Sequence, residues 1–270
     1  MQDGVPLALV AWGSIWPMSS SLPLVSSRPP SPPALVALGD DAPSLERLFL
    51  FARDAELRVR SLRMTIVERS LTARGEEEVR HEVLVRNPGQ ARITTRRSND
   101  AMSRDYDVWI GDGETVRTYR ASDRLASVRT ARTGVVGTDR ADLPPWAQTR
   151  PVVTQLPAGS LADTFVHPHS LFRNVLVTGP LSIVGTSELA GREAIVVRAR
   201  HPRTAKVLVD RPDRWVDVGI DRSSGFVTLL SEHVGEAETR RGEVTLLDLD
   251  PDIPDEAFQL HLGSDVRMLY

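Results

Sequence analysis

Apolar and polar residues alternate with a period of two along most of this chain, which is the pattern of strands that bury one face. The clearest stretch is residues 214–258, where valine and isoleucine alternate with aspartate and glycine from position 216 to 221. Turn residues at 221–225 and a polar link at 235–242 divide this stretch into three antiparallel strands. Prolines and short carboxylates at 250–255 then end the sheet.

The same alternation recurs upstream in short segments that are separated by turn residues. Residues 111–114 (GDGE) give the clearest hairpin signal, and residues 70–78 are expected to form a polar link. Because short turns join the segments, the pattern predicts an antiparallel meander without long helical crossovers. The predicted strands cover residues 64–69, 81–86, 91–97, 106–110, 115–120, 125–129, 181–186 and 194–200.

Two regions show helical spacing instead. Residues 42–58 repeat apolar positions every three or four residues, and Ser44 can cap the start of this helix. Residues 160–166 and 170–177 are predicted as two short helices, which Pro168 separates because it disfavours helix at the residue before it.

Two stretches resemble the LolA/LolB/RseB-like superfamily, which includes the outer-membrane lipoprotein carriers. One is residues 214–258, a strand, a D-x-x-x-G turn and a hairpin that end in PDIPDEAF, and the other is VWIGDGETVRTY at residues 108–119. The resemblance implies a mainly β (α+β) fold, a half-open antiparallel β-barrel with an N-terminal helix and a helical lid insertion. Both helical regions would then lie on the concave side of the sheet.

On such a fold the concave face would form an apolar groove. The alternation assigns to its wall Met64, Ile66, Val83, Val85, Val108, Ile110, Val196 and Val218. The resemblance implies that the insertion covers the groove as a lid, whose apolar side chains are Leu161, Phe165, Leu171, Phe172 and Val175.

Five arginines fall on the predicted strands of the N-terminal half. We expect them on a solvated convex face, and the alternative is a surface for an anionic partner. They are Arg80, Arg86, Arg92, Arg96 and Arg97.

The N-terminal region has a different composition. Residues 1–41 are expected to be either a disordered Pro/Ser-rich extension or an atypical export signal, because the apolar run at 5–16 has no lysine or arginine before it. Residues 42–270 are expected to form a single LolA-like half-barrel domain. The resemblance implies a place in the cell envelope, whereas the poor export signal leaves a cytoplasmic location open.

The composition of the chain argues against a nucleic-acid partner and excludes sites that need cysteine. The net charge is −3 and 41% of the residues are hydrophobic, so a nucleic-acid partner is not expected. The chain has no cysteine, which excludes disulfides, zinc–thiolate sites, a thiol nucleophile and a lipidated cysteine in this sequence.

Candidate catalytic and metal sites are weak. His167 and His169 alternate as a metal pair would, but only Asp163 is near enough in sequence to add a third ligand. Residues 248–252 imitate the start of a calcium loop, yet its sixth and twelfth positions hold Ile253 and Gln259. No nucleophile elbow or phosphate loop is present, so we expect no metal, no cofactor and no enzymatic activity.

By resemblance, the expected function is non-enzymatic binding or carriage of a lipid or a lipoprotein acyl chain, by a monomer. Burial of a chain contributes about 0.8 kcal/mol per CH₂ group, so a long chain needs no ionic anchor. The alternative is an RseB-like regulatory protein in an anti-sigma factor pathway, which would act by contact with an envelope regulatory protein.

Overall fold

The computed structural model describes residues 38–39, 41–73, 75–97, 103, 105–131, 143–147, 152–200 and 212–269. The extension predicted at residues 1–41 lies almost entirely outside these residues. Its separation from a single domain at 42–270 therefore remains a prediction.

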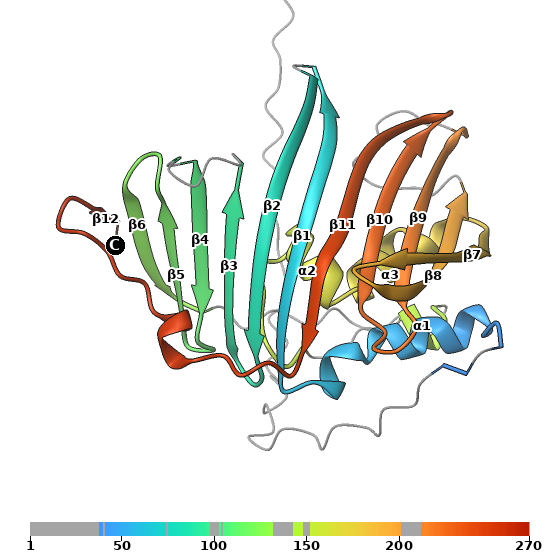
Figure 1. The fold of residues 1–270 in the computed structure, drawn as a ribbon, viewed down its shortest axis with the longest axis horizontal. Coiled ribbons are helices and arrows are strands. Elements are labelled where there is room, and N and C mark those ends of the chain that lie inside the picture. Colours follow the sequence, from blue (N-terminus) through green and yellow to red (C-terminus); the bar gives the residue numbers. More distant parts are fainter. Residues whose placement is uncertain are drawn as a thin grey trace, which may run out of the picture.

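Twelve strands form one sheet in the order β12-β6-β5-β4-β3-β2-β1-β11-β10-β9-β8-β7 (Figure 1). The strands are β1 (Ser61–Thr72), β2 (Gly75–Arg86), β3 (Gln90–Arg96), β4 (Tyr106–Gly111), β5 (Thr115–Arg120), β6 (Leu125–Thr130), β7 (Leu181–Leu189), β8 (Arg192–Arg200), β9 (Arg214–Asp221), β10 (Val227–Val234), β11 (Ala237–Leu249) and β12 (Arg267–Leu269).

The sheet consists of two meanders that meet at its centre. Strands β1 to β6 step outward from the centre, and β7 to β11 step back toward it, so that β11 pairs with β1. Every pair is antiparallel except the short contact of β12 with β6, which is parallel. The strands at the two ends, β12 and β7, have no place beside each other in the order, so the sheet stays half-open. The predicted fold class is confirmed.

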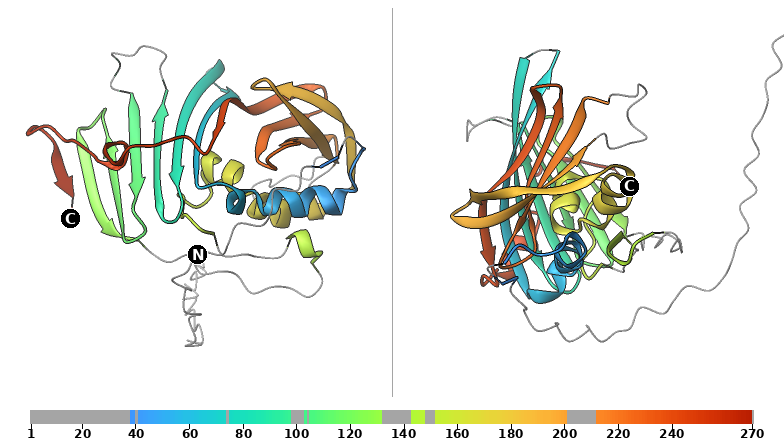
Figure 2. Two further views of the ribbon diagram at one scale, coloured as in Figure 1. Left: turned by 60° about the horizontal axis from the view of Figure 1, so that its bottom comes forward. Right: turned by 90° about the vertical axis from the view of Figure 1, so that its right-hand side faces the viewer.

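Short helices lie on one face of this sheet (Figure 2). They are α1 (Leu45–Arg53), η1 (Ala55–Arg58), η2 (Pro145–Ala147), α2 (Leu161–Val166), α3 (His169–Asn174) and η3 (Leu176–Thr178), while η4 (Asp255–Phe258) lies in the C-terminal segment. Ser44 caps α1 as predicted, since its hydroxyl accepts a hydrogen bond from the backbone N–H of Arg47 at 3.2 Å. None of the helices in the described part of the chain is long and apolar enough to span a membrane.

The main core lies between the sheet and these helices. Phe49 of α1 and Phe165 and Phe172 of the insertion are fully buried there against sheet residues such as Met64 and Val218. Because one core unites both helical regions with one face of the sheet, the prediction that they share the concave side is confirmed.

The convex face carries a second, smaller core. Residues 250–262, which we call the strap, run across it, and Ile253 and Phe258 of the strap pack on Val108 and Ile110 of β4. Without this cover, two apolar side chains of β4 would face water.

Two of the five arginines expected on a solvated face hold the strap instead. Arg86 donates to the carbonyl oxygen of Ile253 at 2.9 Å and pairs with Asp255, and Arg92 donates to the carbonyl oxygen of Ala257 at 3.0 Å. The strap is irregular, so these carbonyl groups have no partner in a sheet or helix, and the two arginines supply the hydrogen bonds.

Two expected links and one short strand differ from the predictions. The expected polar link at 70–78 is the far end of a long hairpin, in which Ser70 pairs with Glu77. The link at 235–242 is mostly strand, because β11 already begins at Ala237. Strand β12 was not predicted, since three residues are too few to show an alternation.

Candidate functional site

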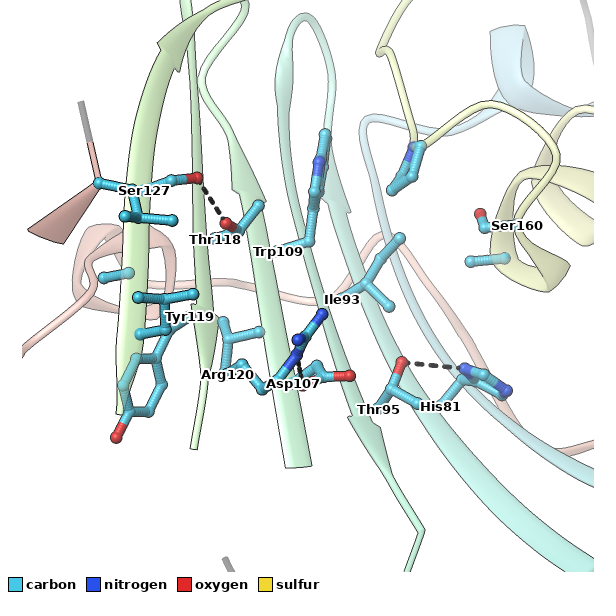
Figure 3. Close-up of a pocket in the computed structure, with 16 residues that line it drawn as sticks. His81, Ile93, Thr95, Asp107, Trp109, Thr118, Tyr119, Arg120, Ser127 and Ser160 are labelled. Carbon is cyan, nitrogen blue, oxygen red and sulfur yellow. Dashed lines mark hydrogen bonds and ion pairs between the residues drawn. The ribbon is translucent and has the colours of Figure 1, made fainter. Parts of the chain in front are cut away.

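An open trough of about 370 Å³ lies on the concave face over β2 to β6, beside the start of α2 (Figure 3). Its volume falls within the range of roughly 300–1,000 Å³ that small-molecule sites occupy. Its lining includes Ile93, Trp109, Thr118, Leu125, Ser127 and Leu269. Ser160 and Ala162, at the start of the insertion, form the wall nearest the lid.

The floor of the trough is a row of residues that face one another across neighbouring strands. Ile93 of β3 pairs with Trp109 of β4, which pairs with Thr118 of β5, which pairs with Ser127 of β6. Trp109 stands between Ile93 and Thr118 (Figure 3). The row is apolar at its β3 end and hydroxylated at its β6 end.

The position of the Trp109 indole depends on a glycine two residues further along the strand. A Cβ atom at Gly111 would lie 2.6 Å from the outer edge of the indole, so any larger residue would push the ring away. Gly111 therefore lets the ring lie along the strand instead of standing in the open trough.

A row of polar side chains bounds the apolar floor at the end of the sheet remote from α1. His81 contacts Thr95 at 3.1 Å and Glu68 at 3.2 Å, and Arg240 donates to Glu68 at 2.6 Å. The hydrogen bond with His81, with help from the charge of Arg240, lowers the pKa of Glu68 to about 2. Glu68 is therefore ionised at all ordinary pH values.

The polar row continues onto the next two strands. Glu232 of β10 lies 3.4 Å from Arg240 and accepts a hydrogen bond from Arg214 of β9 at 2.8 Å. Six adjacent strands, β3, β2, β1, β11, β10 and β9, thus each contribute one residue to the row. The members from His81 to Arg214 are paired with one another within the row. These pairs hold the polar side chains in place at this edge of the concave face.

The other half of the concave face is filled by the insertion. Phe165 of α2 reaches the sheet at Gly242 of β11, where an added Cβ would lie only 3.2 Å from the phenyl ring. Phe172 of α3 packs against Phe49 and Trp146, with ring centroids 4.8 Å and 6.3 Å apart. The insertion therefore meets the sheet through aromatic side chains.

All five predicted lid residues belong to this filled half. Leu161, Phe165, Leu171 and Phe172 are buried in the main core, and Val175 packs against it. Whether they move for a ligand stays a prediction.

A buried ionic cluster ties the insertion to the turn after α1. His167 is 2% exposed at its side chain; its Nδ1 lies 2.9 Å from Asp163 and its Nε2 3.3 Å from Glu56. Burial alone would lower the pKa of His167, but the hydrogen bond with Asp163 and the charges of Asp163 and Glu56 outweigh it and raise the pKa to about 9. His167 is therefore a buried cation between two carboxylates.

Glu56 is the centre of this cluster. It also accepts hydrogen bonds from the backbone N–H groups of Val153 and Thr154, at 3.0 Å and 2.7 Å. Burial would raise the pKa of Glu56, yet His167 and these backbone donors lower it. One carboxylate thereby fixes both the segment that precedes α2 and the turn between α2 and α3.

His167, one of the two histidines considered as metal ligands, makes ionic contacts instead. His167 faces Glu56 and Asp163, and the ring of His169 lies 6.4 Å from that of His167. Within the described ranges, no group of three or more histidine, aspartate or glutamate side chains is placed to hold a metal ion.

Five of the eight residues assigned to the groove wall lie in the main core on the concave face: Met64, Ile66, Val83, Val85 and Val218. They share this core with Phe165 and Phe172. Their role in contacting a ligand remains a prediction, because in this state helices and neighbouring side chains cover them.

The alternation assigned the other three to the wrong face. Val108 and Ile110 flank Trp109 on β4 and therefore point to the convex side, where the strap covers them. Val196 pairs with Gly219, whose open side meets Leu229, whereas its neighbour Val197 lies in the main core. Apolar residues occupy both faces of β4 and β8, so alternation alone could not decide between them.

Sequence reasoning missed the trough residues Trp109, Thr118 and Ser127. Trp109 lies between Val108 and Ile110, so an apolar residue stands at every position there and the pattern does not show which face the ring takes. Thr118 and Ser127 meet only through the register of β5 and β6, which turn patterns do not fix.

No protein-family model matches this sequence, and no curated protein matches it. Solved structures of similar fold include MucB, at 18% identity over 81% of this chain and 62% of that chain, with a TM-score of 0.45. A LolA superfamily protein from Nitrosomonas europaea matches at 9% identity over 81% of this chain and 99% of that chain, with a TM-score of 0.32. The Mycobacterium tuberculosis lipoprotein LppX matches at 13% identity over 79% of this chain and 99% of that chain, with a TM-score of 0.41.

These likenesses concern the fold alone. This chain spans about three fifths of the length of MucB, which has also been solved in complex with MucA from Pseudomonas aeruginosa. At such identities they say nothing about which residues of this chain meet a ligand or a partner.

Proposed function

We propose that this protein binds an apolar chain, such as the acyl chain of a lipid or a lipoprotein, in the open trough and acts as a non-enzymatic carrier. The observation that carries the proposal is the trough itself: an apolar floor on the concave face, beside Ile93 and Trp109, that the insertion leaves uncovered. Ile93 is buried and Trp109 is half-buried there, so an apolar ligand on the floor would cover the part of Trp109 that remains exposed.

The boundaries of the trough support the same proposal. On the lid side it ends at Ala162, next to the aromatic contacts of Phe165, and on the remote side the polar row begins at Thr95 and His81. An apolar chain would therefore lie along the floor between these two boundaries.

Titration of a fluorescent acyl probe tests this proposal. Trp109→Ala should weaken binding about tenfold, because loss of roughly 50–60 Å² of apolar contact corresponds to about 1.4 kcal/mol. Trp215→Ala is the matched control, since Trp215 stacks on His233 at 4.9 Å on the convex face, and should leave binding unchanged. Equal effects of the two substitutions would argue against the trough as the site.

If no acyl probe binds the folded protein, the regulatory function through protein contact becomes the better candidate. That function would make the concave face a surface for a protein segment instead of a lipid chain.

A further inference from the structure

The ionisable side chains that line the open trough already have partners within the protein. They are His81, Asp107 and Arg120. His81 is held by Glu68, and Asp107 accepts a hydrogen bond from Arg97 at 2.9 Å. Arg120 pairs with Asp123 at 3.2 Å and lies 3.8 Å from Asp107. Among the described residues of the trough, no cation is left to neutralise an anionic ligand.

The remaining polar groups of the trough are uncharged. Thr118 and Ser127 share a hydrogen bond of 2.7 Å on the floor, and Thr95 contacts His81 at the edge. A hydroxyl group can donate once and accept twice, so each of these keeps capacity for a ligand. They can hydrogen-bond a neutral polar group without any compensating charge.

One acceptor in the trough lacks a donor. The Oδ1 atom of Asp107 is buried and receives no hydrogen bond from the described part of the chain, and Arg120 Nε is too distant to supply one. Because this oxygen has almost no accessible surface, a ligand does not reach it, and the hydroxyl groups of Thr118 and Ser127 are the polar groups that a ligand would meet.

We propose that the trough selects an amphipath whose polar end is uncharged and carries hydroxyl groups, such as a monoacylglycerol, over fatty acids, lysophospholipids with anionic heads and alkylamines. This inference rests on the proposed function and names its ligand class. A charged head would have to enter a site whose charges are already matched, and would leave its own charge unpaired there.

Four probes with the same lauroyl-length chain test this selection: monolauroylglycerol, laurate, lauroyl lysophosphatidate and dodecylammonium. Each would compete with a fluorescent neutral acyl probe at low and at high salt. We expect monolauroylglycerol to bind at least about tenfold more tightly than the charged probes, with little dependence on salt.

A pair of variants links the selection to the floor hydroxyls. Thr118→Val combined with Ser127→Ala should weaken monolauroylglycerol several-fold and leave laurate unchanged, since each lost hydrogen bond is worth a factor of about 2–10. Thr186→Val combined with Ser182→Ala makes the same chemical change at exposed positions of β7, outside the trough, and should alter neither affinity.

The outcomes separate the two proposals. Equal affinity for all four probes would mean that the head group lies in water, which overturns this inference and keeps the trough as an acyl site. Tighter binding of a charged probe that weakens with salt would overturn it as well. Binding of none of the four would remove the proposed function together with the inference.

Discussion

At the scale of single residues, the best-defined feature of the insertion is the buried cation His167. Its two carboxylate neighbours, Glu56 and Asp163, come from the turn after α1 and from α2. A buried charge without partners is strongly unfavourable, so removal of any one member leaves the others exposed to that cost. The cluster therefore fixes where the lid meets the rest of the molecule.

This cluster predicts a specific dependence of stability on pH. Because folding raises the pKa of His167 from 6.5 to about 9, its contribution is fully present below pH 6.5 and is lost as the pH rises toward 9. The free energy of unfolding in urea should fall by on the order of 3 kcal/mol across this window, and His167→Gln should remove that fall.

His169→Gln is the matched control, since the same change two residues away leaves Glu56 and Asp163 facing their cation. It should keep the pH dependence of the unmodified protein. An unfolding free energy of His167→Gln that falls between pH 6.5 and 9 as steeply as in the unmodified protein would contradict the assignment.

At the scale of elements, α2 is placed by a glycine of the sheet. Gly242 on β11 leaves the space that Phe165 occupies, just as Gly111 on β4 leaves the space for Trp109. In each place the strand lacks a side chain, so that a ring can lie close to its backbone: the ring of α2 at Gly242 and the ring of the same strand at Gly111. Gly242 lies in the filled part of the concave face, and Gly111 lies beside the open trough.

Gly242→Val should therefore displace α2. We expect it to lower the unfolding free energy by about 1–3 kcal/mol through overpacking against Phe165. In combination with Phe165→Ala, which makes room, the loss should be smaller than the sum of the two single losses. Gly39→Val is the control, because a Cβ there meets no atom within 4 Å. Strictly additive losses would mean that the two sites do not touch.

The sequence predicts most of the elements but not all of their faces. Residues 216–221 of β9 have one apolar and one polar face, so the period of two places Val218 correctly in the core. It failed at Val108 because the distant strap makes the convex face of β4 apolar as well. The trough could not be foreseen either, because it depends on the pairing of Thr118 with Ser127 and on where the insertion stops.

At the scale of the whole molecule, the half-open sheet has two compartments on one face. One is filled by the aromatic side chains of the insertion around Trp146, and the other is the open trough around Trp109. The polar row from Thr95 to Arg214 bounds the concave face at one end. We propose that an apolar chain binds in the open compartment.

Trp109 and Trp146 allow this proposal to be tested directly. The measurement is the quenching of tryptophan fluorescence by an acylglycerol that carries bromine atoms on its chain. Because such quenching requires contact with the ring, we expect saturable quenching in the unmodified protein and in Trp146→Phe, and its loss in Trp109→Phe. Quenching that persists in Trp109→Phe and disappears in Trp146→Phe would place the chain beneath the insertion and contradict the proposed site.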